Sequence, residues 1–203
     1  NTRTAFVGQN GQGKSTLAKV IVGEIDYTGH LKLGHNVQIG YFAQNQADYL
    51  DPDKTVLDTM TDAADINTRS KVRDILGAFL FRGEEVDKYV KVLSGGERNR
   101  LALAKMLLSP FNVLIMDEPT AVLTPQETVG LFRFLREFAA KGNAAIFISH
   151  KLDEVMEICD RMSVMRDGQM IGTVKREDTD QRRLANMMVG RDVLLRVDKK
   201  PGN

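Results

Sequence analysis

One glycine-rich stretch carries the residue types that bind phosphate. Residues 8–16 read Gly-Gln-Asn-Gly-Gln-Gly-Lys-Ser-Thr and match the pattern G-x-x-x-x-G-K-[ST] at every fixed position. Glycines let the backbone turn tightly and point successive N–H groups at one anion. The Lys14 ammonium can reach the terminal phosphates of a nucleotide, and the Ser15 hydroxyl can bind Mg²⁺. The predicted phosphate-binding residues are Gly8, Asn10, Gly11, Gly13, Lys14, Ser15 and Thr16.

The flanking residues predict the strand and the helix that such a loop requires. Residues 4–7 form a short apolar run, and residues 17–22 can continue a helix. A helix that starts at the loop adds unpaired N–H groups and the positive end of its dipole. This context disfavours the alternative interpretation, a chance glycine-rich turn.

Polar side chains follow two other apolar runs. Asp117 and Glu118 come at the end of residues 113–116, and Ser149 separates residues 144–148 from His150. Such runs are typical of parallel strands, whose carboxyl ends share one rim of the sheet. Asp117 is predicted to hold Mg²⁺, Glu118 to orient or deprotonate the attacking water, and His150 to contact the γ-phosphate. For the acidic pair, the alternative is a solvated turn.

A second glycine-containing stretch precedes a predicted helix at residues 98–108. Residues 93–97 read Leu-Ser-Gly-Gly-Glu, and serine and glycine at a helix start form either an anion site or an ordinary helix cap. One chain would then have two phosphate-facing helix starts. We therefore expect the second one to serve a γ-phosphate bound on another protomer, through Ser94, Gly95, Gly96 and Glu97.

The remaining pattern predicts the supporting elements. Two short helices at residues 50–92 indicate a helical subdomain at about residues 50–109, inserted in the α/β core. Alternating residues at 31–33 and 37–39 predict one hairpin, and Asp167-Gly168 predicts another. Further helices are expected at residues 125–141, 152–158 and 181–189.

The alternation of strands and helices predicts an α/β fold of the P-loop NTPase kind. It has a mostly parallel sheet flanked by helices, an inserted helical subdomain and a small antiparallel β portion. Residues 1–198 are expected to form a single domain, and residues 199–203 a disordered tail. Because so few residues precede the first strand, the domain is expected to be incomplete at its N-terminus.

Composition narrows the class of protein. The 203 residues have a net charge of +1, so charge does not favour nucleic acid as a partner, and we expect no direct DNA binding. The single cysteine, Cys159, excludes an intrachain disulfide framework, suits a reducing compartment and is expected to be buried. No apolar run approaches the roughly 20 residues of a membrane span. A cytoplasmic protein is expected.

The order of these motifs resembles the ATP-binding cassette (ABC) ATPases over nearly the whole chain. The residues that carry it are the phosphate loop, Gln44, residues 93–97, residues 115–118 and His150. The resemblance implies that ATP and Mg²⁺ bind at a composite site between two cassettes. It makes Glu118 the catalytic base, His150 the γ-phosphate switch and Lys14 a catalytic group. Gln44 would act in catalysis and metal binding and link the nucleotide to the helical subdomain.

The finer resemblance is divided. Residues 41–46 and 93–107 are similar to soluble cassettes of the translation-factor (ABC-F) type, which implies a ribosomal partner. Residues 121–127, 149–154 and 187–191 resemble sugar and nucleoside importer ATPases. That type implies membrane permease subunits and a peripheral position on the inner face of the membrane. The ABC-F type has a charged linker between cassettes that this chain lacks, which favours the importer. The third alternative is a truncated nucleotide-binding fragment.

Overall fold

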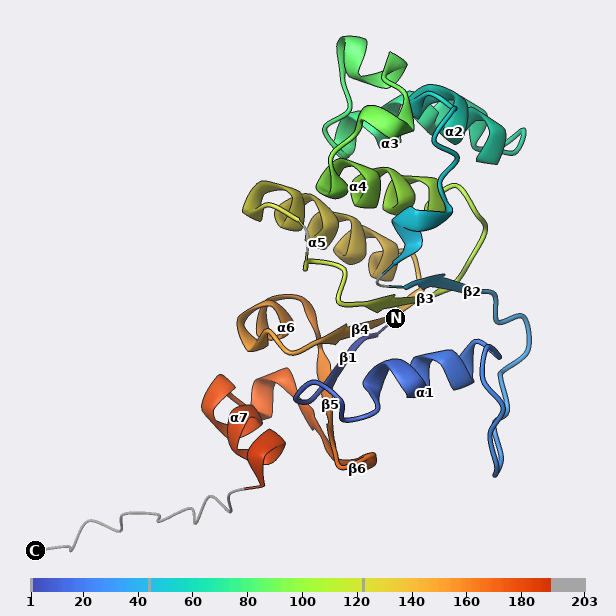
Figure 1. Cartoon of the computed structure of the whole chain (residues 1–203). Coiled ribbons are helices and arrows are strands. Elements are labelled where there is room, and N and C mark those ends of the chain that lie inside the picture. The colour runs from blue at the N-terminus through green and yellow to red at the C-terminus, as the bar shows by residue number, and fades with distance from the viewer. Residues whose placement is uncertain (1, 44, 122, 191–203) are drawn as a thin grey trace, which may run out of the picture.

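A computed structural model describes residues 2–43, 45–121 and 123–190 of the chain (Figure 1). Its centre is a six-stranded sheet with the order β2-β3-β4-β1-β5-β6. Strands β1 to β5 all run parallel to one another, and β6 is antiparallel to β5. The strands are β1 (Arg3–Val7), β2 (Ile39–Phe42), β3 (Val113–Asp117), β4 (Ala144–Ser149), β5 (Arg161–Arg166) and β6 (Gln169–Lys175).

Helices cover both faces of this sheet. The α-helices are α1 (Lys14–Ile21), α2 (Val56–Ala63), α3 (Val72–Ala78), α4 (Gly95–Met106), α5 (Pro125–Ala140), α6 (Leu152–Ile158) and α7 (Gln181–Val189). Short 3₁₀ helices lie at Gln46–Tyr49, Arg69–Lys71, Gly83–Asp87, Val90–Val92 and Arg176–Asp178. Helix α1 lies on one face of the sheet, and α5 and α6 lie on the other (Figure 1).

The alternation of strand side chains explains this layering. Phe6, Ile115 and Ile148 pack with Ala18 of α1 in one buried cluster. Their neighbours along the strands point to the opposite face, where they pack in a second cluster with residues of α5 and α6. Both faces of the central strands are therefore buried, as the continuous apolar runs predict. The predicted α/β fold with a mostly parallel sheet is confirmed.

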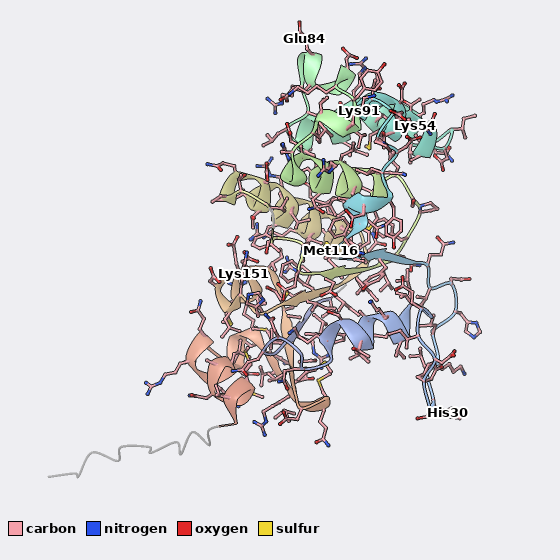
Figure 2. The ribbon with its side chains drawn as sticks, in the orientation of Figure 1. His30, Lys54, Glu84, Lys91, Met116 and Lys151 are labelled. Atoms are coloured by element: carbon pink, nitrogen blue, oxygen red, sulfur yellow. The ribbon has the colours of Figure 1, made fainter. Side chains whose placement is uncertain are left out.

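Helices α2, α3 and α4 gather beyond α5, away from the sheet (Figure 1). Lys54, Glu84 and Lys91 lie in this helical part, at the opposite end of the molecule from His30 (Figure 2). Its apolar side chains, such as Met60 and Leu76, belong to the same buried cluster as Leu131 of α5. Helices occupy the region for which the sequence predicts an inserted helical subdomain, and the domain boundaries themselves stay a prediction.

The hairpin expected at residues 31–39 is wrong. Residues 31–38 form no strand, and β2 (Ile39–Phe42) instead pairs in parallel with β3. Leu31 and Leu33 are 38% and 46% exposed. Their side chains do not pack into the core, so burial does not stabilise a strand there. The hairpin expected around Asp167-Gly168 is confirmed as β5–β6, which is the antiparallel part of the sheet. The tail expected to be disordered, residues 199–203, lies outside the described residues.

None of the helices within the described ranges is both long and apolar enough to span a membrane. The thiol of Cys159 is fully buried at the end of α6, as expected. Burial raises its pKa to about 12. A thiol with such a pKa is almost entirely protonated at neutral pH, so Cys159 is a packing residue rather than a nucleophile.

Candidate nucleotide-binding site

The phosphate loop connects the end of β1 to the start of α1. Gly13 caps α1 with a φ of +90°, a left-handed conformation that favours glycine. Gly8 is required for a different reason: a Cβ atom there would lie 2.5 Å from the backbone oxygen of Met165 in β5. The loop therefore passes against the β5–β6 end of the sheet, and glycine permits that approach.

Lys14 is the first residue of α1 and is only 6% exposed. Its Nζ donates hydrogen bonds to the backbone oxygens of Gly8 at 2.8 Å and Gln9 at 2.9 Å. Burial lowers the pKa of Lys14, and the negative charges of Glu118 and Asp117 oppose that shift. A phosphate placed at the loop would stabilise the charged ammonium further.

A cleft of about 360 Å³ lies over the loop. It brings together residues from three segments far apart in the sequence: the phosphate loop, the turn after β3 and the turn after β4. Its lining consists of Asn10, Gly11, Gln12, Gly13, Lys14, Ser15, Thr16, Glu118, Ala121 and His150. Gln12 and Ala121 are not among the predicted site residues. Gln12 occupies a variable position of the motif, but its side-chain oxygen accepts a hydrogen bond from the backbone N–H of Asp167.

Glu118 and His150 meet at the rim of the cleft. Glu118 Oε1 lies 2.8 Å from His150 Nδ1, because β3 and β4 are neighbours and end at the same height. Glu118 has a φ of +48°, a strained conformation for a residue with a side chain. Its N–H donates to the backbone oxygen of Ile148 at 2.9 Å. Among the described residues, Glu118 Oε2 has no hydrogen-bond partner. The Glu118 side chain lines the cleft, where its carboxylate can accept a proton from a water.

Asp117 ends β3 and is 4% exposed. Its Oδ1 has no hydrogen-bond partner among the described residues. A buried carboxylate oxygen without a donor fits a cation, and Mg²⁺ prefers hard oxygen ligands such as this one and the Ser15 hydroxyl. Within the described ranges no group of three or more His, Cys, Asp and Glu side chains could hold a metal ion. Mg²⁺ bound to nucleotide phosphates needs only one or two protein ligands.

The predicted second phosphate contact does not line this cleft. Ser94 caps α4: its Oγ accepts from the N–H of Glu97 at 3.2 Å, and Glu97 Oε2 accepts from the N–H of Ser94 at 2.7 Å. The hydrogen bond from the Ser94 backbone lowers the pKa of Glu97. Ser94 and Gly95 are exposed, and a Cβ on Gly95 would meet no atom within 4 Å. Gly96 follows in the first turn of α4. Gln44 lies outside the described residues.

Comparison with known proteins identifies the family. A family model described as ABC transporter matches residues 1–121. The chain belongs to the ABC transporter family. As an ABC ATPase domain it resembles a solved chain described as "Structure of ATP binding subunit of ABC transporter", with a TM-score of 0.78 over 92% of this chain and 83% of the other. That likeness, at 20% identity, supports the fold alone.

Curated relatives of this ABC domain include import proteins. "Ribose import ATP-binding protein RbsA 2" of Burkholderia ambifaria is 37% identical over 97% of this chain and 43% of its own length. "Glucose import ATP-binding protein TsgD13" of Haloferax volcanii is 33% identical over 96% and 44%. "ABC transporter F family member 5" of Arabidopsis thaliana is 39% identical over 82% and 24%. The chain thus spans less than half the length of these relatives.

Proposed function

We propose that this ABC domain hydrolyses MgATP to energise the import of a small solute, of the sugar or nucleoside class, through membrane permease subunits. The observation that carries the proposal is the cleft in which buried Lys14 faces the Glu118–His150 pair. The names of the ribose and glucose import relatives support the transport role. A peripheral position on the cytoplasmic face of the membrane follows from that role.

The side chains would divide the work as follows. The loop N–H groups and Lys14 bind the β- and γ-phosphates, and the start of α1 adds its dipole. Ser15, Asp117 and Gln44 are the proposed oxygen ligands of Mg²⁺, which neutralises phosphate charge when bound. Glu118 accepts the proton of the attacking water, while His150 holds Glu118 and contacts the γ-phosphate. The phosphoryl group is then transferred to that water, giving ADP and phosphate.

The second half of the site would come from another cassette. Ser94, Gly95, Gly96 and Glu97 are at the exposed start of α4, outside the cleft of their own chain. Backbone N–H groups at that start can bind the γ-phosphate held by a facing protomer. A two-fold arrangement would complete two equivalent sites at once.

The ABC-F alternative, with the ribosome as partner, rests on the F-family relative, which covers a smaller share of this chain than the import relatives do. We therefore keep the importer as the proposed function. The truncated nucleotide-binding fragment is the outcome that an inactive chain would support.

The test is steady-state ATP hydrolysis with Mg²⁺. We expect Lys14→Ala and Glu118→Gln each to lower kcat at least a hundredfold, and Lys14→Ala also to weaken ATP binding. Lys19→Ala is the matched control: Lys19 lies on the same helix but does not line the cleft. Wild-type turnover by Lys14→Ala would contradict the proposal.

A further inference from the structure

A closed ring of hydrogen bonds lies beside the Glu118–His150 pair. The hydroxyl of Thr120 donates to Glu154 Oε2 at 2.5 Å. Lys151 Nζ donates to Glu154 Oε1 at 3.1 Å, and to both Thr120 Oγ1 and the Thr120 backbone oxygen at 3.3 Å. Each of the three side chains therefore contacts the other two.

The ring joins the two segments that carry the proposed catalytic pair. Thr120 lies two residues after Glu118, in the turn after β3, and Lys151 directly follows His150, in the turn after β4. Glu154 lies on α6, which starts at Leu152 (Figure 2 labels Lys151 beside this helix). The ring thus links the turn after β3 to the turn after β4 at a second point, in addition to the 2.8 Å contact between Glu118 and His150.

Burial distinguishes this ring from an ordinary surface ion pair. Thr120 is 2% exposed and the side chain of Glu154 is 14% exposed, whereas that of Lys151 is 35% exposed and reaches solvent. An ion pair that is fully exposed on a helix surface contributes little to stability. Here the hydroxyl donates to the carboxylate and accepts from the ammonium, so all three groups are fixed in one arrangement.

The ring helps to hold the strained backbone conformation of Glu118. Glu118 has a φ of +48°, so its turn is not in a relaxed conformation. The turn is tied by the hydrogen bond from Glu118 N to Ile148 O, by that from Ala121 N to Glu118 O at 3.1 Å, and by the ring at Thr120. Loss of the ring frees the turn at one of these points.

We propose that Thr120, Lys151 and Glu154 are positioning residues that hold Glu118 and His150 in register for ATP hydrolysis. None of the three lines the cleft, so they act through the pair and not on the nucleotide. A general base must lie within hydrogen-bond reach of the proton it accepts, and misplacement by about 1 Å can cost about a hundredfold in rate. The inference rests on the proposed ATPase function.

Two matched pairs of variants test this role. Thr120→Val removes the hydroxyl and keeps the shape, whereas Thr120→Ser keeps the hydroxyl. Glu154→Gln removes a charge of the ring, whereas Glu157→Gln removes a charge of the same helix that pairs with Arg136 at 2.8 Å, away from the ring. We expect Thr120→Val and Glu154→Gln to lower kcat at least tenfold with KM for ATP changed less than twofold. Thr120→Ser and Glu157→Gln should stay within threefold of wild type.

A crystal structure of Thr120→Val provides a readout that needs no hydrolysis. We expect Glu118 Oε1 and His150 Nδ1 to separate beyond hydrogen-bond distance; if Thr120→Val does not fold, Glu154→Gln takes its place. An unchanged separation, an unchanged kcat, or an equal loss in Glu157→Gln would each overturn the positioning role while leaving the ATPase proposal intact. A wild-type protein without turnover, in which the variants still separate the pair, would overturn the proposed function and keep the positioning.

Discussion

At the scale of single residues, position 8 requires glycine because the backbone of Met165 lies very close to it. The space where its Cβ would lie is occupied by a backbone oxygen of β5, which cannot rotate away as a side chain can. Gly95 is the opposite case, because open space surrounds the position of its Cβ. The chain itself therefore requires glycine at position 8 but not at position 95, where the proposed composite site supplies the reason for glycine.

We predict that Gly8→Ala lowers the free energy of unfolding by about 1–3 kcal/mol, because the added methyl group overpacks the contact with Met165. Urea unfolding followed by circular dichroism measures the change. Gly95→Ala is the control and should leave stability unchanged or slightly raised, since alanine favours a helix start more than glycine does. If Gly8→Ala were as stable as wild type, β5 would have to shift away from the added methyl group, and the contact would not require glycine.

At the scale of elements, Arg100 joins three helices. The Arg100 Nε atom of α4 approaches Glu127 Oε1 of α5 at 3.1 Å, with side chains 12% and 10% exposed. Among the described residues Nε has no hydrogen-bond partner, so its contact with Glu127 is Coulombic. Arg100 Nη1 also donates to the backbone oxygen of Phe79 after α3 at 3.2 Å, and the guanidinium lies 5.0 Å from the Phe81 ring centre.

We predict that Arg100→Met lowers the free energy of unfolding by about 3–5 kcal/mol, because it leaves the Glu127 carboxylate buried without its counter-charge. The double variant Arg100→Met/Glu127→Gln should recover part of that loss. A double-mutant cycle in urea separates the two contributions. Additive losses would contradict direct coupling of α4 to α5.

Another ion pair joins Arg3, the first residue of β1, to Asp160, which directly precedes β5. Arg3 Nη2 lies 2.7 Å from Asp160 Oδ1, and the Arg3 backbone N–H donates to Asp160 Oδ2 at 2.9 Å. The hydrogen bond from the Arg3 side chain is the main cause that lowers the pKa of Asp160 in the folded protein. The ion pair therefore stabilises the fold fully above the pKa that Asp160 has in the unfolded chain. That stabilisation is lost as pH falls through the lower pKa of Asp160 in the folded protein.

We predict that Asp160→Asn lowers stability by less than about 1 kcal/mol at neutral pH, since the Asp160 side chain is 41% exposed and solvent screens the pair. The difference from wild type should shrink as pH falls from about 5 to about 2. Chemical unfolding at several pH values measures it. A difference that grows in acid would reverse the assigned direction of the pKa shift.

At the scale of the whole molecule, the two proposed phosphate-binding surfaces face different partners. The cleft lies at the carboxyl ends of β1, β3 and β4, whereas the start of α4 is exposed and outside it. In the proposed composite site, the γ-phosphate lies between these two surfaces. ATP that cannot be hydrolysed would therefore hold two chains together.

We predict that Glu118→Gln forms a dimer with ATP and Mg²⁺, because glutamine keeps the shape of the base but does not accept the proton. Light scattering after size exclusion measures the mass, and addition of Ser94→Arg should return the protein to monomer. A monomer of Glu118→Gln with ATP demonstrably bound would support the nucleotide-binding fragment instead of the composite site.

Local patterns in the sequence determined the phosphate loop, the buried strands of the sheet and the turn at Asp167-Gly168. The reason is that each depends on residues adjacent in the chain: glycine where φ is positive, apolar runs where both faces are covered, and a turn dipeptide between strands. The rim that carries Asp117, Glu118 and His150 follows from the same runs, since parallel strands end together.

Only the tertiary structure decided which strands are neighbours, and every long-range contact follows from that order. Alternation with a period of two is compatible with either a hairpin or a parallel edge, so residues 37–39 could not reveal that β2 pairs with β3. Glu118 and His150 are 32 residues apart in sequence, and Thr120 and Glu154 are 34 apart. Both contacts form only because β3 lies beside β4. Such partners have no local signature, because the side chains that meet are selected by packing of the whole sheet.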